Sequence, residues 1–109
     1  MMQQLKLKDG VVTYDDLSHW IAPNKPDLLK SAAWHGEDLM QISFWNDQYI
    51  IDIGWYPSLD ITGEFAVIVV KNKNWDEYLF MECTRSYDGL IYAINKAVEF
   101  IYAQIVDGK

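Results

Sequence analysis

The sequence predicts an α+β fold, in which an antiparallel sheet of about four to five strands packs with N-terminal helices and a long C-terminal helix. Two patterns predict it. Residues after Leu39 alternate between apolar and polar with a period of two, as strands do, and the segment from Leu90 onward repeats its apolar positions with the helical period. A length of 109 residues, half of them apolar, fits one domain that spans residues 1–109.

The N-terminal third is expected to hold a short edge strand and two helices. Apolar and basic residues alternate over residues 5–8, which predicts the strand. Thr13 precedes two acids and an apolar stripe over residues 17–21, so the pattern predicts a helix that Thr13 caps. Pro26 opens a second short helix, and an extended segment that turns at residues 35–36 is the alternative.

The middle of the chain is predicted to form the sheet. Period-two segments over residues 40–45 and 49–55 flank an Asn-Asp pair, which is typical of a β-hairpin. Residues 65–70 are apolar on both faces, so we expect a central strand that is covered on each side. A further strand is expected around residues 78–83, with Cys83 as a buried core thiol.

The C-terminal segment predicts a helix of about 20 residues, roughly 30 Å long. Ser86 is positioned to cap it, and Asp88 suits the positive end of its dipole. The residues expected on its apolar face are Leu90, Ile91, Ile94, Ala97, Val98, Ile101 and Ile105. We expect this face to cover the sheet.

Composition excludes several classes of function. The net charge of −7 argues against a nucleic acid or an anionic membrane surface as partner, because both require a basic patch. No apolar run approaches the length of a membrane span, and the N-terminus lacks the features of a secretory signal, so we expect a cytoplasmic protein. The single Cys83 cannot form a disulfide within the chain, and no metal-ligand or nucleotide-binding motif is present. We therefore expect no cofactor, no metal and no enzymatic activity.

The acidic residues are concentrated in the first two thirds of the chain. Residues 9–64 hold 10 acids and 2 bases, whereas residues 65–109 hold 6 acids and 5 bases. This bias is either a device for solubility or the mark of a basic partner. Asp52 interrupts an apolar strand pattern, which predicts a carboxylate that is solvent-facing or hydrogen-bonded by an amide, with a functional role as the alternative.

The segment from Gly54 to Glu64 is expected to be a loop that is longer than a hairpin needs and that carries aromatic rings, a proline and acids. Its Trp55 and Tyr56 either cap the core or anchor a partner, since Trp and Tyr are favoured at interfaces. Trp75 lies in a predicted turn and is the tryptophan expected to be partly exposed. The candidate partner-binding residues are Trp55, Tyr56, Asp60, Glu64, Trp75, Asp76, Glu77, Glu37 and Asp38.

The segment from Ile51 to Trp75 reads IDIGWYP, then an acid- and glycine-containing turn, then EFAVIVVKNKNW. This pattern resembles small bacterial immunity proteins that are encoded beside contact-dependent growth-inhibition toxins or other polymorphic toxins. The resemblance implies a non-enzymatic antitoxin that binds the C-terminal toxin domain of its cognate effector and covers the active site or the substrate surface. A nuclease toxin is expected, because an enzyme that cuts nucleic acid presents a basic surface to which an acidic protein is complementary.

Two other classes of function remain open from the sequence. The aromatic excess is compatible with a small-ligand or peptide-binding module that has a Trp-lined pocket between the sheet and the N-terminal helices. A hydrolase would require Asp52, Cys83 and the two histidines, His19 and His35, to converge in one cleft.

Overall fold

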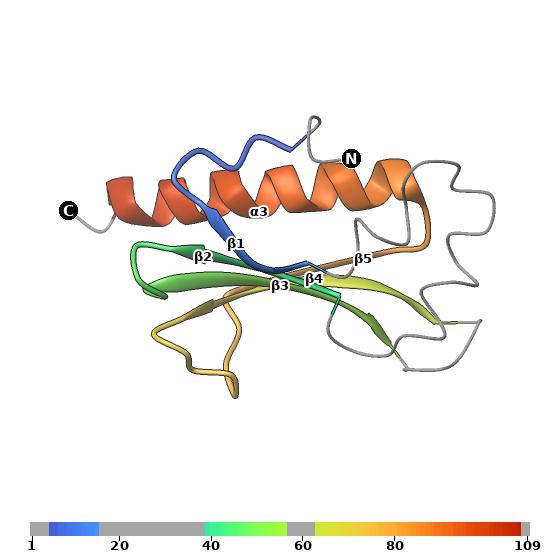
Figure 1. The fold of residues 1–109 in the computed structure, drawn as a ribbon, viewed down its shortest axis with the longest axis horizontal. Helices are drawn as coiled ribbons and strands as arrows, with labels where there is room; N and C mark the ends of the chain where they lie inside the picture. The colour runs from blue at the N-terminus through green and yellow to red at the C-terminus, as the bar shows by residue number, and fades with distance from the viewer. Residues whose placement is uncertain (1–4, 16–38, 57–62, 108–109) are drawn as a thin grey trace.

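A computed structural model describes residues 5–15, 39–56 and 63–107, which form five strands and one helix (Figure 1). The elements are β1 (Val11–Asp15), β2 (Met40–Phe44), β3 (Tyr49–Tyr56), β4 (Glu64–Lys71), β5 (Phe80–Thr84) and α3 (Tyr87–Asp107). The strands form a single antiparallel sheet in the order β1-β2-β3-β4-β5. The α+β class, the antiparallel sheet and the long C-terminal helix are confirmed.

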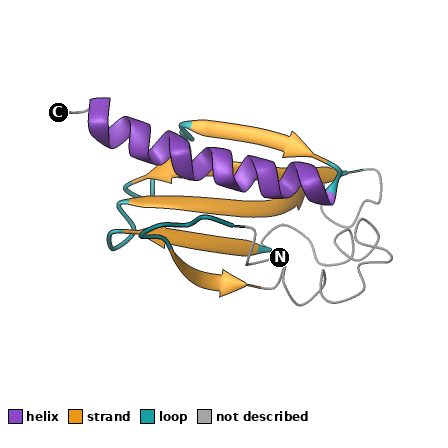
Figure 2. Cartoon of the chain, turned by 90° about the horizontal axis from the view of Figure 1, so that it is seen from above, coloured by secondary structure: helices purple, strands orange, loops and turns teal. Residues whose placement is uncertain are grey.

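The sheet and the helix form two layers. Helix α3 lies over one face of the sheet and runs roughly along the strands (Figure 2). The connection between β4 and β5 lies on the opposite side of the sheet from α3 (Figure 1). No helix among the described residues is long and apolar enough to cross a membrane.

The hydrophobic core fills the space between the sheet and α3. The sheet contributes alternate residues of three strands, because successive side chains of a strand point to opposite faces: Met40, Ile42, Phe44, Tyr49, Ile51, Ile53, Trp55, Phe65, Val67 and Val69. The helix contributes the face that its sequence predicts, with Leu90, Ile94, Ala97, Val98 and Ile101 buried and Ile91 and Ile105 partly buried. Strand β4 also buries Ala66 and Val70 on its other face, as expected for an internal strand.

The start of α3 is capped as predicted. The Ser86 hydroxyl oxygen accepts a hydrogen bond from the Gly89 backbone N–H at 2.9 Å, which satisfies one of the unpaired donors of the first turn. Gly89 packs closely on the residues that precede the helix. A Cβ at this position would overlap the Thr84 and Ser86 hydroxyls, so the sequence places its smallest residue there.

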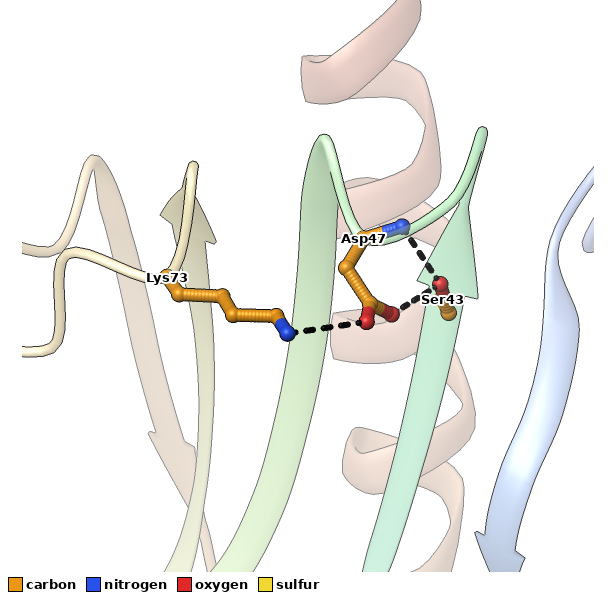
Figure 3. A network of polar contacts seen from close by, with 3 residues as sticks. All are labelled: Ser43, Asp47 and Lys73. Carbon is orange, nitrogen blue, oxygen red and sulfur yellow. Dashed lines mark hydrogen bonds and ion pairs between the residues drawn. The ribbon is translucent and has the colours of Figure 1, made fainter.

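The predicted β2–β3 hairpin is confirmed, and side-chain hydrogen bonds hold its turn (Figure 3). The Ser43 hydroxyl donates to Asp47 Oδ1 at 2.5 Å, and the Asp47 backbone N–H donates to Ser43 Oγ at 3.0 Å. Lys73, from the β4–β5 connection, forms an ion pair with Asp47 at 3.4 Å. The Ser43 hydrogen bond is the largest single cause that lowers the pKa of Asp47; burial opposes it, and the hydrogen bond and charge of Lys73 lower the pKa further. This network joins the two turns at one end of the sheet.

Two predictions for the N-terminal segment are wrong, namely a strand over residues 5–8 and a helix that begins at Thr13. Residues 5–8 form no strand; they lie along α3, where the Lys6 N–H donates to Asn95 Oδ1 at 2.8 Å. Thr13 does not cap a helix, because it belongs to strand β1, which pairs with β2. The β-branched and aromatic residues of β1 favour a strand, and pairing with the free edge of β2 outweighs the local cap signal. The rest of the first predicted helix and the segment after Pro26 lie outside the described residues.

Candidate functional site

The candidate site lies on the face of the sheet that points away from α3. One row across strands β2 to β5 is made of residues that lie directly opposite one another: Gln41, Asp52, Ile68 and Met81. Toward the end of the sheet, Ala66 lies opposite Cys83. Beyond that pair, Tyr56 lies opposite Glu64 in the last pair of the β3–β4 register. Paired residues of adjacent strands share a face, so these side chains form one surface.

This surface is hollowed into a cavity of about 640 Å³. Its described lining residues are Gln41, Asp52, Tyr56, Glu64, Ala66, Ile68, Trp75, Tyr78, Met81 and Cys83. Three of these described residues carry aromatic rings, with exposed fractions of 37% for Tyr56, 45% for Trp75 and 49% for Tyr78. Trp75 and Tyr78 come from the β4–β5 connection, which leaves the sheet at the end remote from Tyr56. The cavity therefore lies between aromatic groups that two separate segments supply.

The described lining of this cavity includes two carboxyl groups, which differ in burial. Asp52 is only 4% exposed, and its Oδ1 accepts a hydrogen bond from the Gln41 side-chain amide at 3.1 Å. This is the amide-bonded alternative that the sequence left open. Glu64 is exposed, and no lysine, arginine or histidine of the described residues forms an ion pair with it. One carboxyl group thus sits in the sheet and the other at the solvent edge.

The charge around this cavity is one-sided. Within residues 5–15, 39–56 and 63–107, no basic side chain lines it. Several basic residues lie on the helix side instead. Lys6 and Lys8 belong to the N-terminal segment before β1, which lies alongside α3. Lys8 Nζ is 4.4 Å from the centre of the Tyr102 ring. Lys96 projects from α3 and pairs with Glu82 at 3.6 Å. The described lining of the cavity therefore attracts cations.

Cys83 is exposed, so the expectation of a buried core thiol is wrong. Met81 and Cys83 do share one side of β5 as predicted, but that side faces away from α3, and Met81 is also exposed. Leu79, which precedes β5, is exposed too. Partial burial, then the charges of Glu64 and Glu82, raise the pKa of the Cys83 thiol. A thiol with a raised pKa is a poor nucleophile at neutral pH.

The structure brings together three of the predicted partner-binding residues, since Tyr56, Glu64 and Trp75 all line the cavity. Asp76 and Glu77 follow Trp75 and are exposed in the same connection. Trp75 is half-exposed, as the sequence predicts. The candidates Asp60, Glu37 and Asp38 lie outside the described residues.

Trp55 does not belong to this surface; of the two roles that the sequence leaves open for Trp55, packing on the core is the one observed. Residues 54–56 continue strand β3, and Glu64 begins β4, so the connecting segment is shorter than expected. The Trp55 side chain is fully buried on the α3 face and packs edge-to-face on Phe65, with ring centres 5.0 Å apart. Strand alternation sends Trp55 into the core and its neighbour Tyr56 to the cavity.

Sequence reasoning missed several lining residues: Gln41, Ala66, Ile68, Tyr78 and Met81. The available signal was the alternation within each strand combined with the register between strands. Gln41 and Asp52 were visible as polar positions within apolar segments, but only the register shows that they are opposite one another.

The described residues contain no group of three or more histidine, cysteine or acidic side chains arranged to hold a metal ion. Both histidines lie outside the described residues. The arrangement of rings and carboxyl groups suits the binding of a positively charged group, by attraction to the ring faces and to the carboxylates.

No family model, curated protein or solved structure matches the chain. The function must therefore be inferred from the geometry of the site and from the sequence pattern.

Proposed function

We propose that this protein is a non-enzymatic antitoxin of the immunity-protein kind. It binds a basic toxin domain, a nuclease in the first instance, through the sheet face that carries the cavity, and it neutralises the toxin by covering its active site or substrate surface. A cytoplasmic location and the absence of catalysis are parts of this proposal.

The observation that carries the proposal is the juxtaposition of Tyr56, Glu64 and Trp75 around one cavity that has no basic side chain among its described lining residues. Exposed aromatic rings supply anchors for a protein partner, and carboxylates supply complementarity to a basic one. Asp76 and Glu77 extend the acidic surface beyond the cavity. The resemblance of residues 51–75 to immunity proteins suggests that this basic partner is a toxin domain.

The size of the molecule is sufficient for this role. Its accessible surface is 6338 Å², and a standard interface takes about 800 Å² from each partner. An interface of that size would cover about an eighth of the molecular surface. The acids are expected to raise the association rate, whereas the buried part of the aromatic rings slows dissociation.

The decisive experiment uses the toxin domain of the effector encoded next to this gene. The full chain is expected to inhibit its nuclease activity at a one-to-one ratio, and the association rate is expected to fall steeply as salt rises. The double variant Asp76→Asn/Glu77→Gln should reduce the association rate by about threefold to tenfold at low salt.

A matched double variant controls for net charge. Asp88→Asn/Glu99→Gln removes the same amount of charge from α3, on the other side of the sheet, and is expected to leave the association rate nearly unchanged. Equal effects of the two double variants would exclude the cavity face as the interface. Absence of any complex with the neighbouring toxin would exclude the antitoxin function.

The volume of the cavity favours a second candidate function, a small-ligand or peptide-binding module. A cavity of about 640 Å³ lies within the range of small-molecule sites, which is roughly 300 to 1,000 Å³. Titration of the full chain with metabolite fractions, followed by tryptophan fluorescence, tests this alternative. A saturable change with a purified small molecule in the absence of any protein would favour it.

A further inference from the structure

The cavity is open in a way that favours a side chain of a macromolecule over a free small molecule. Typical small-ligand sites bury about 70 to 90% of their ligand. Here the bordering residues Trp75, Tyr78 and Met81 are 45%, 49% and 51% exposed. The acidic surface also continues past the cavity into Asp76 and Glu77.

The chemistry of the lining selects among positively charged side chains. Lysine offers a compact ammonium group, whereas arginine offers a flat guanidinium that stacks on aromatic rings and pairs with a carboxylate through two hydrogen bonds. Glu64 and Tyr56 lie opposite each other at one end of the cavity, so a carboxylate and a ring border the same part of it. Ile68, Ala66 and Met81 lie along the cavity and suit an aliphatic stem.

The electrostatic environment at this end is consistent with a site for a cation. The charge of Glu64 contributes to the raised pKa of Cys83, which places the carboxylate close enough to influence the neighbouring part of the cavity. Asp52, in the sheet, carries the second carboxyl group of the lining. No basic side chain of the described chain supplies an ion-pair partner for Glu64.

We infer that the cavity receives an arginine side chain of the basic partner, with its guanidinium paired to Glu64 beside the Tyr56 ring and its stem along the apolar lining. This inference rests on the proposed function only in naming a basic toxin domain as the source of the arginine. The preference for a guanidinium group follows from the residues that line the cavity.

The test uses the full chain labelled with ¹³C at the methionine methyl groups, with the Met81 signal assigned from Met81→Leu. N-acetyl-arginine amide is the probe, and N-acetyl-citrulline amide is its neutral control of the same shape. The arginine probe is expected to shift the Met81 signal at concentrations about tenfold lower than the citrulline control. Glu64→Gln should weaken its binding by about fivefold, as expected for loss of one partly exposed charged partner.

Glu99→Gln is the matched variant, because it removes an acid that is also exposed but belongs to α3, and it should leave the affinity for the arginine probe unchanged. Equal affinities for the arginine and citrulline probes, or equal effects of the two variants, would overturn the inference. A free polyamine such as spermidine that binds at least tenfold more tightly than the arginine probe would also overturn it, in favour of a small-molecule site.

Failure of this inference is distinguishable from failure of the proposed function. A toxin domain that binds the wild type and Glu64→Gln with equal affinity leaves the antitoxin function intact and excludes the arginine pocket. Specific binding of the arginine probe without any complex with the neighbouring toxin supports the pocket and excludes the antitoxin function.

Discussion

Tyr56 and Glu64 lie opposite each other in the last residue pair of strands β3 and β4, and both line the cavity on the face away from α3. The pair closes one end of a surface on which Cys83 is also exposed. Glu64 lies two positions before Ala66, the residue that is paired with Cys83, so its side chain and the thiol are neighbours on one face. The reactivity of Cys83 therefore reports on this end of the cavity.

Replacement of Glu64 is expected to change the reactivity of that thiol. Burial is the largest cause of its raised pKa, followed by the charge of Glu64 and then by that of Glu82. Glu64→Gln should therefore lower the pKa of Cys83 and speed alkylation by iodoacetamide at pH 8 by about twofold, because the thiolate is the reactive form. Glu82→Gln should have a smaller effect. A rate in Glu64→Gln equal to that of the wild type would contradict the placement of Glu64.

Substitutions of Trp55 and Trp75 are expected to have different effects, the first on folding stability and the second on binding of the partner. Trp55→Phe removes part of a fully buried side chain and should lower the free energy of unfolding in urea by about 2 kcal/mol. Trp75→Phe alters a half-exposed ring and should change it by less than about 0.5 kcal/mol, but it should weaken binding of the partner. Trp45→Phe controls for loss of an exposed tryptophan outside the cavity. Equal losses of stability from the Trp55 and Trp75 variants would contradict the assignment.

The hydrogen bond from Ser43 is expected to determine the titration of Asp47. Ser43→Ala should raise the pKa of Asp47 toward its ordinary value of 3.8, because the Ser43 hydrogen bond is the largest single cause of the shift, and Lys73→Met should also raise it. The pKa of Asp47 is lower in the folded protein than in the unfolded chain. The ionised Asp47 therefore stabilises the folded state above about pH 3.8, and this stabilisation is lost as the pH falls through the folded-state pKa. Carboxyl ¹³C NMR during an acid titration measures the shift. An unchanged pKa in Ser43→Ala would exclude the network.

The Tyr102 hydroxyl is expected to fasten the N-terminal segment to α3. It donates to Asp9 Oδ2 at 2.6 Å and accepts from the Asp9 N–H at 3.1 Å. Tyr102→Phe should lower the free energy of unfolding by about 1 kcal/mol, whereas Tyr92→Phe, at an exposed position on the same helix, should have little effect. Equal effects of the two variants on urea unfolding would contradict this role.

The same tyrosine should give the wild type a specific alkaline response. Burial, then the Asp9 hydrogen bond, raise the pKa of Tyr102. A raised folded-state pKa means that the folded protein retains the proton longer, so stability falls as pH rises from about 10, the ordinary tyrosine value, through the folded value. Urea unfolding at successive pH values should show this loss in the wild type and not in Tyr102→Phe.

Local patterns determined the elements whose partners are close in sequence. The β2–β3 hairpin follows from two alternating segments around a turn, and α3 follows from its apolar period and its Ser86 cap. Each signal lies within a short window, and the core selects the apolar face of each element. The α+β class and the helix on one face of the sheet were therefore predictable from the residues.

Tertiary structure decided which face of each strand is covered and which segment pairs with the edge of the sheet. Thr13 lies in a strand because β2 offers an unpaired edge, and Cys83 is exposed because α3 covers the other face of β5. Alternation separates Trp55 from Tyr56 but does not say which of them faces the helix. That choice depends on register and on packing between residues far apart in the chain, and the same packing assembles the cavity.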